Sequence, residues 1–256
     1  MLTSVRSLLA ATVLAGSVLA ATPAFAQDEE EGAESPISIS GNVAVTSDYR
    51  FRGVGLSGGD IALQGGIDLT STSGFYVGTW GSSIQGGTPY GELELDVYAG
   101  WTGQVAEGVT FDVGLLVYLY PTGDDPLNLD PDTDYFEPYA SIAGSIGPVT
   151  ATLGAAYAWD QDALGGSDNL YVYTDFSLGV PSTPLTFTAH AGYTDGVFAP
   201  PLLAGTGDDT GLDWSLSASM PIYGGLTGSV TYVGVEGPSI DGFTDDTILA
   251  TISFAG

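Results

Sequence analysis

The segment Glu92-Leu93-Glu94-Leu95-Asp96-Val97-Tyr98-Ala99-Gly100-Trp101 decides the fold class, because polar and apolar residues alternate along most of it. Successive side chains of a β-strand point to opposite faces. One face therefore carries the three acids and Tyr98, and the other carries the two leucines, Val97, Ala99 and Trp101. This period of two predicts a strand between a polar and an apolar environment.

Eleven further segments repeat this alternation, and the strand from residue 74 is ambiguous in its facing. The twelve predicted strands are 37–52, 60–70, 74–82, 92–101, 111–120, 136–142, 149–159, 170–178, 185–193, 214–220, 226–235 and 247–254. Short, nearly uncharged connections alternate with longer acidic ones such as 121–134, 160–168, 195–213 and 236–246. One rim of turns and one rim of loops is typical of an all-β, antiparallel, closed transmembrane barrel of about 12 strands. A soluble sandwich with Greek-key crossings is the alternative, but it would not keep this alternation.

The composition excludes several functions. The chain has 31 acidic and 3 basic residues, a formal net charge of −28, and no cysteine. Nucleic acid is excluded as a partner because phosphate binding needs a basic face. A disulfide framework and a thiolate metal site are excluded as well. No phosphate-binding glycine motif occurs, and we expect neither a cofactor nor a metal.

The N-terminal residues predict export. Residues 1–26 have the pattern of a signal peptide, with Arg6, an apolar run from Leu8 to Ala20 and the small-x-small site Ala24-Phe25-Ala26. Residues 27–36 form an acidic lead-in, and residues 37–256 form the barrel. We expect the outer membrane of a Gram-negative bacterium, with the lead-in and the short turns in the periplasm and the acidic loops outside.

The acids within strands lie on the face opposite the apolar row, so we expect them inside the barrel. The segment from Thr46 to Gly53 is interpreted as the end of the first strand, with Asp48, Arg50 and Arg52 inward and Tyr49 outward. The predicted pore-lining residues are Asp48, Arg50, Arg52, Asp68, Glu92, Glu94, Asp96, Asp112, Glu137 and Asp175. The two arginines either cross-link a closed interior or form one side of a constriction, and these interpretations are compatible.

Two other features suggest chemistry. His190 is the only histidine and has inward parity beside the strand that carries Asp175, so a barrel hydrolase is one hypothesis and a hydrogen-bonded wall residue the other. The alternating acids of Asp130-Pro131-Asp132-Thr133-Asp134 suggest Ca²⁺. That loop lacks the glycine and the distal acid of an EF-hand, which favours a solvated acidic loop.

Several short motifs carry a resemblance to a family. They are Thr46–Gly53, Gln64-Gly65-Gly66, Ser73-Gly74-Phe75-Tyr76, Trp80-Gly81-Ser82, Glu92-Leu93-Glu94-Leu95-Asp96 and Tyr98-Ala99-Gly100. The chain resembles the TorF-type porins of proteobacteria over essentially its whole mature length. This resemblance implies an outer-membrane location and a pore, with outer-membrane lipid and the assembly machinery as partners. It assigns no catalytic or substrate-binding residue.

These observations together predict an outer-membrane porin that passes small hydrophilic solutes passively and prefers cations. The alternatives are a closed structural or surface-interaction barrel and, less favoured, a hydrolase that uses His190. The acids at the predicted mouth and in the lumen are the reason for the cation preference, since they concentrate positive ions. The natural solute, the pore radius and the oligomeric state stay open.

Overall fold

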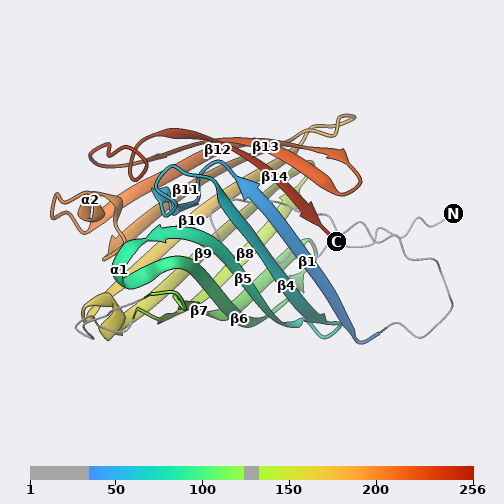
Figure 1. The fold of residues 1–256 in the computed structure, drawn as a ribbon. Coiled ribbons are helices and arrows are strands. Elements are labelled where there is room, and N and C mark those ends of the chain that lie inside the picture. The colour runs from blue at the N-terminus through green and yellow to red at the C-terminus, as the bar shows by residue number, and fades with distance from the viewer. Residues whose placement is uncertain (1–34, 124–132) are drawn as a thin grey trace, which may run out of the picture.

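A computed structural model gives the fold of residues 35–123 and 133–256. The predicted signal peptide, nearly all of the acidic lead-in, and Asp130 and Asp132 of the acidic loop lie outside these described residues. Twelve strands form a closed antiparallel barrel in the order β1-β14-β13-β12-β11-β10-β9-β8-β7-β6-β5-β4 (Figure 1). The predicted fold class is thereby confirmed.

The barrel strands follow the period-two segments closely. They are β1 (Ile37–Thr46), β4 (Ala62–Ser71), β5 (Phe75–Gly86), β6 (Gly91–Ala106), β7 (Val109–Leu119), β8 (Tyr135–Ile146), β9 (Val149–Gln161), β10 (Ser167–Gly179), β11 (Thr186–Gly196), β12 (Thr210–Tyr223), β13 (Leu226–Val235) and β14 (Thr247–Ala255). A small hairpin, β2 (Arg50–Phe51) and β3 (Val54–Gly55), lies outside this sheet. The described helices are α1 (Gly87–Tyr90), the 3-10 turn η1 (Asp162–Leu164) and α2 (Pro200–Leu203). None of them is long and apolar enough to cross a membrane.

The connections alternate as the sequence predicts. Tight turns join β4 to β5, β6 to β7, β8 to β9, β10 to β11 and β12 to β13, whereas the remaining connections are loops. Figure 1 shows α1 and α2 at one end of the barrel and the C-terminus at the other. We call these ends the loop end and the turn end.

The outer face of the barrel is apolar. Side chains predicted to point outward are exposed, as Leu153 at 56% and Ile248 at 67% illustrate. Their neighbours in sequence point inward, so each strand separates an apolar surface from a polar interior. Phe75 and Val77 place the ambiguous strand β5 in the same scheme, because they are exposed while Tyr76 and Trp80 are buried.

Inward-facing tyrosines lie over glycines of the neighbouring strand. Tyr98 is paired with Gly78, Tyr76 with Gly100 and Tyr173 with Gly154 across adjacent strands. A methyl group on any of these glycines would collide with the ring of its partner. The missing side chain therefore makes room for a large aromatic ring that covers the exposed backbone, a known way of stabilising strand glycines.

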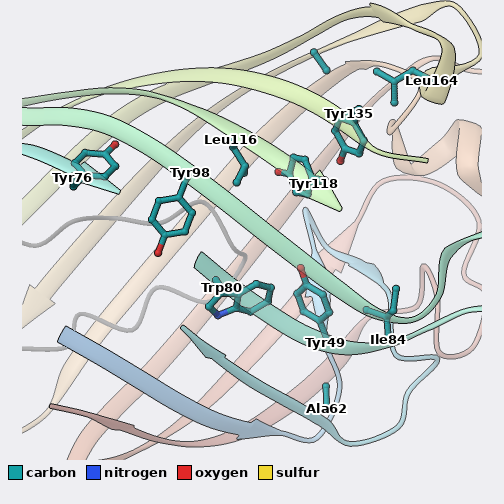
Figure 2. Close-up of a cluster of buried hydrophobic side chains, with 11 residues drawn as sticks. Tyr49, Ala62, Tyr76, Trp80, Ile84, Tyr98, Leu116, Tyr118, Tyr135 and Leu164 are labelled. Carbon is teal, nitrogen blue, oxygen red and sulfur yellow. The ribbon is translucent and has the colours of Figure 1, made fainter. Parts of the chain in front are cut away.

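The interior differs between its two halves. Toward the loop end, a cluster of buried side chains fills the lumen, including Trp80, Tyr118 and Tyr135. Figure 2 shows these side chains projecting from β5, β7 and β8, with Tyr49 among them. Toward the turn end, many inward positions carry small hydroxyl residues that are partly exposed. Examples are Thr110, Ser141, Thr152, Ser177, Thr188 and Ser217.

Candidate functional site

The interpretation of residues 46–53 as the end of the first strand is wrong. Strand β1 ends at Thr46 and β4 begins at Ala62. Between them the chain leaves the wall, places the buried and half-buried residues 48–57 inside the barrel, and returns through the exposed residues 58–61. We call residues 47–61 the inserted segment. Arg52 adopts φ +49° and Gly53 φ +78°, which are not strand conformations, so the extended chain cannot continue there. Tyr49, predicted to face lipid, is only 3% exposed and lies inside.

Asp48 organises the base of the inserted segment. Its carboxylate accepts hydrogen bonds from the Ser57 hydroxyl at 2.7 Å and from the Gly59 N–H at 3.2 Å, and it is also paired with Arg50. The Ser57 oxygen in turn accepts the Tyr49 N–H at 2.8 Å. These contacts join both ends of the segment into a compact loop, since they connect residues eight to eleven positions apart.

Arg52 connects the segment to the opposite wall. Its Nη2 donates to both carboxylate oxygens of Glu137 on β8, at 2.8 and 2.7 Å, and both side chains are almost fully buried. The Tyr118 hydroxyl also donates to Glu137, at 3.1 Å. The guanidinium lies 4.2 Å from the centre of the Tyr171 ring, within the range of a cation–π contact. Arg52 therefore contacts side chains of two nearby wall strands, β8 and β10.

Tyr49 makes a second contact with the wall. Its hydroxyl donates to Glu94 on β6 at 2.6 Å, and its ring packs edge-to-face on Trp80 at 5.5 Å between centroids. Burial, followed by the negative charges of Glu94 and Asp96, raises the pKa of Tyr49 well above its ordinary value. The phenol therefore stays protonated and continues to donate to Glu94.

Arg50 binds the last loop rather than the strand wall. Beyond its pairing with Asp48, it donates to the Asp245 carboxylate at 2.9 Å and to the backbone oxygen of Phe243 at 3.0 Å. Burial alone would raise the pKa of Asp245, but the hydrogen bond and charge of Arg50 lower it below its usual value. The two arginines thus attach the segment to different parts of the barrel, Arg50 to the last loop and Arg52 to the strand wall.

A second polar cluster surrounds His190 on β11. Its Nδ1 lies 2.6 Å from Asp175, and its Nε2 lies 3.0 Å from Asp213 and 2.8 Å from the Tyr171 hydroxyl. The predicted proximity of His190 and Asp175 is confirmed by this contact. Both ring nitrogens face carboxylate or phenol oxygens, the arrangement of a hydrogen-bonded wall residue, and none of these partners is a serine nucleophile.

Sequence reasoning missed Asp213. The sequence predicts a loop over residues 195–213, but β12 begins at Thr210, and Asp213 is a buried inward residue paired across the sheet with Gly192. The available signal was the alternation of inward and outward positions, because Asp213 continues the inward row of Ser215 and Ser217. A carboxylate two residues before that row could have been assigned to the lumen.

The other predicted acids occupy inward strand positions. Near the turn end, Asp112 accepts the Tyr76 hydroxyl at 2.8 Å, and Asp68 accepts the Tyr98 hydroxyl at 2.6 Å. Glu92 shares the inward parity of β6 but is exposed at the loop end. The structure thus brings Arg50 together with Asp48 and Arg52 with Glu137, and separates both pairs from Asp68 and Asp112.

Asp96 is 1% exposed in the packed part of the lumen, beside Glu94 and Glu137. Within the described residues, no three His, Asp or Glu side chains are arranged to hold a metal ion.

The closed twelve-stranded barrel, with an apolar exterior and a polar lumen, places the chain in the porin-type class of folds. It is similar to a NanC porin with a TM-score of 0.55 at 10% identity, covering 86% of this chain and 98% of that one. It is also similar to a KdgM porin solved in complex with disordered oligogalacturonate, with a TM-score of 0.51 at 8% identity, covering 85% and 95%. At these identities the likeness concerns the fold alone.

A family described as "Bacterial protein of unknown function (Gcw_chp)" matches residues 30–252, and this chain belongs to that family. The comparison with curated proteins found no match.

Proposed function

We propose that this protein is an outer-membrane channel of the TorF type that passes small hydrophilic solutes and prefers cations. The observation that carries the proposal is the polar lumen inside an apolar exterior. Exposed apolar side chains cover the outer face of the described strands, and inward positions carry hydroxyls and carboxylates. Such a surface is stable in a bilayer and unfavourable in water over this area.

The proposed path has a wide and a narrow part. From the turn end, a solute meets the small hydroxyl residues of the wall, which are partly exposed. Toward the loop end, the inserted segment and the aromatic cluster of Trp80, Tyr118 and Tyr135 narrow the lumen, with Arg52 and Glu137 paired inside it. The proposed pore-lining residues are Asp68, Glu94, Asp96, Asp112, Glu137 and Asp175 on the wall, Glu92 at the mouth, and Asp48, Arg50 and Arg52 on the segment.

Charge supports the cation preference. In the described lumen, only Arg50, Arg52 and His190 can carry positive charge, whereas the wall acids, Asp48 and Asp213 outnumber them. The exposed acids of the loops extend the negative potential outward, which raises the local concentration of cations. Screening by salt weakens this effect, because the Debye length falls from about 30 Å at 0.01 M to about 3 Å at 1 M.

Planar-bilayer recording of the refolded full chain tests the channel. Reversal potentials in a KCl gradient should favour K⁺, and more strongly at low salt. Replacing luminal Asp112 by Asn should reduce the K⁺ preference. The matched control Asp168→Asn, at an exposed acid bonded to the outward Tyr157, should change it less. A Cl⁻ preference would contradict the charge argument.

One observation favours a closed structural barrel as the second candidate. Tyr49, Arg52 and the aromatic cluster are almost fully buried at the loop end, as expected of a filled interior. Correctly folded protein that gives no single-channel current above background, in any salt, would favour this second candidate over the channel.

A further inference from the structure

The barrel wall is complete without the inserted segment. Strand β1 pairs with β4 up to Thr46 and Ala62, the residues at which the segment leaves and rejoins the wall. On its other edge, β1 pairs with β14 up to Thr46 and Thr251. The next residue, Ser47, still donates its N–H to the Ala250 carbonyl of β14 at 2.9 Å. Because the ladders do not include residues 48–61, that part of the segment can leave the lumen without breaking a hydrogen bond of the barrel ladders.

A small number of contacts hold the segment against the strand wall. Arg52 binds Glu137, Tyr49 binds Glu94, and the Gln85 N–H donates to the Leu56 carbonyl at 2.7 Å. The ion pair is the one contact among these with a full charge on each side, and charged hydrogen bonds are roughly twice as strong as neutral ones. Arg52 and Glu137 are therefore the main latch to the strand wall, and a second ion pair, Arg50 with Asp245, holds the segment to the last loop.

The latched state leaves polar groups unsatisfied. Within residues 35–123 and 133–256, Nε and Nη1 of Arg52 are buried without a hydrogen-bond partner. Arg52 also holds the left-handed φ of +49°, which is costly for a residue with a side chain. A segment moved into water would hydrate these nitrogens and relax this residue. Gly58 and Gly59 have positive φ near the end that rejoins the wall, and glycine can adopt many other backbone conformations there without steric cost.

We infer that the inserted segment is a displaceable plug, latched in the lumen by Arg52 on Glu137, whose departure opens the loop half of the barrel. The inference deepens the proposed channel and rests on it for its physiological meaning. Displacement itself is a separate event that can be measured without any current.

Thiol labelling measures the displacement. Ala62 is fully buried, belongs to the same packed cluster as Tyr49, and lies where the segment rejoins the wall. The chain has no cysteine, so Ala62→Cys supplies a single thiol. We would follow its reaction with a small water-soluble methanethiosulfonate in the folded full-length barrel. Glu137→Gln, which neutralises the latch with little change in shape, should raise the labelling rate at least tenfold.

Asp112→Asn is the matched control for that substitution. It also removes one luminal carboxylate that accepts a tyrosine hydroxyl, but at the turn end and away from the segment. Labelling should stay within about twofold of the parent rate. If Glu137→Gln does not give the compact, heat-modifiable form on a gel, Tyr49→Phe serves instead, with an expected increase of a few fold. Equal protection of the introduced thiol in the Ala62→Cys parent and in the folded latch variant overturns the plug.

A reversible lock connects the plug to conduction. Leu56→Cys and Gln85→Cys change the two residues whose backbones are hydrogen-bonded, and oxidation should join the segment to β5. The control pair is Ser217→Cys and Thr231→Cys, at positions that face each other on β12 and β13. With both disulfides confirmed by mass, the first should reduce open-channel time at least tenfold, reversibly with reductant, and the control should not.

The labelling experiment and the disulfide lock distinguish the plug from the channel. Faster labelling of the latch variant without current in any variant would refute the channel and support the plug. Current that is unaffected by the lock, together with unchanged labelling, would overturn the plug and leave the channel in place.

Discussion

The buried pair between Arg52 and Glu137 predicts a strongly non-additive double-mutant cycle. The side chains are 4% and 1% exposed, so little solvent screening reduces their interaction. Removing one member of such a pair costs about 3–5 kcal/mol, because the remaining charge is buried without its counter-ion, whereas replacing both by apolar residues is often nearly neutral. Arg52→Met and Glu137→Leu should therefore each destabilise strongly, and the double variant much less than their sum.

The two single variants should not be equal. Arg52→Met leaves a carboxylate on β8, a strand fixed in the wall by its neighbours on both sides. Glu137→Leu leaves a guanidinium on the inserted segment, which can move into water if it is a plug. Arg52→Met should then cost more than Glu137→Leu. The cation–π contact with Tyr171 is lost in both variants that lack Arg52, so it cancels from the coupling.

Urea unfolding of the refolded barrel in detergent, followed by intrinsic fluorescence and by heat-modifiability on gels, measures all four proteins. We expect a coupling free energy of about 3 kcal/mol, which is a factor of more than 10² in the unfolding equilibrium. Single effects that add within about 0.5 kcal/mol would refute the reasoning, because independent residues behave in this way.

Two further predictions concern the wall and the last loop. Gly154→Ala should destabilise the barrel by about 1–3 kcal/mol, because its methyl group would collide with the Tyr173 ring. Gly144→Ala, whose methyl group would meet its nearest atom at 3.7 Å, should cost less, and equal losses would contradict the packing argument. Asp245 should contribute stability above the ordinary carboxyl pKa of about 4 and lose it as the pH falls further, because Arg50 lowers its pKa. The stability difference between the parent and Asp245→Asn, measured by thermal unfolding, should therefore shrink below about pH 4, and a constant difference would refute it.

The strands could be predicted because the wall separates two environments. A membrane barrel needs apolar residues on one face of every strand and tolerates polar residues on the other, so a period of two runs through the whole sequence. This constraint is local to each strand, and the alternation within residues 149–159 alone is enough to place Leu153, Tyr157 and Trp159 on the outer face, where they are exposed. The same constraint resolved neither face of β5, because its inward residues Tyr76 and Trp80 are themselves aromatic.

Explaining the strand glycines requires the pairing register between strands as well as the sequence. Gly100 and Gly154 are inward positions of β6 and β9, and nothing in their own strands explains the absence of a side chain. The explanation is on the neighbouring strand, where Tyr76 and Tyr173 stand directly opposite. Each contact joins residues from two different strands, so the alternation within one strand does not reveal it.

The inserted segment could not be predicted from the alternation of inward and outward residues, since that alternation assumes that each residue belongs to a strand of the wall. Asp48, Tyr49, Arg50 and Arg52 alternate as a strand would, and their types fit an inward and an outward face. Their partners, among them Glu94 and Glu137, come from distant strands that meet only when the barrel closes. An extended strand would place Tyr49 in lipid, whereas the folded segment buries its ring and satisfies its hydroxyl. The contacts that hold the segment therefore exist only in the assembled barrel, so no pattern within residues 47–61 reveals where the segment lies.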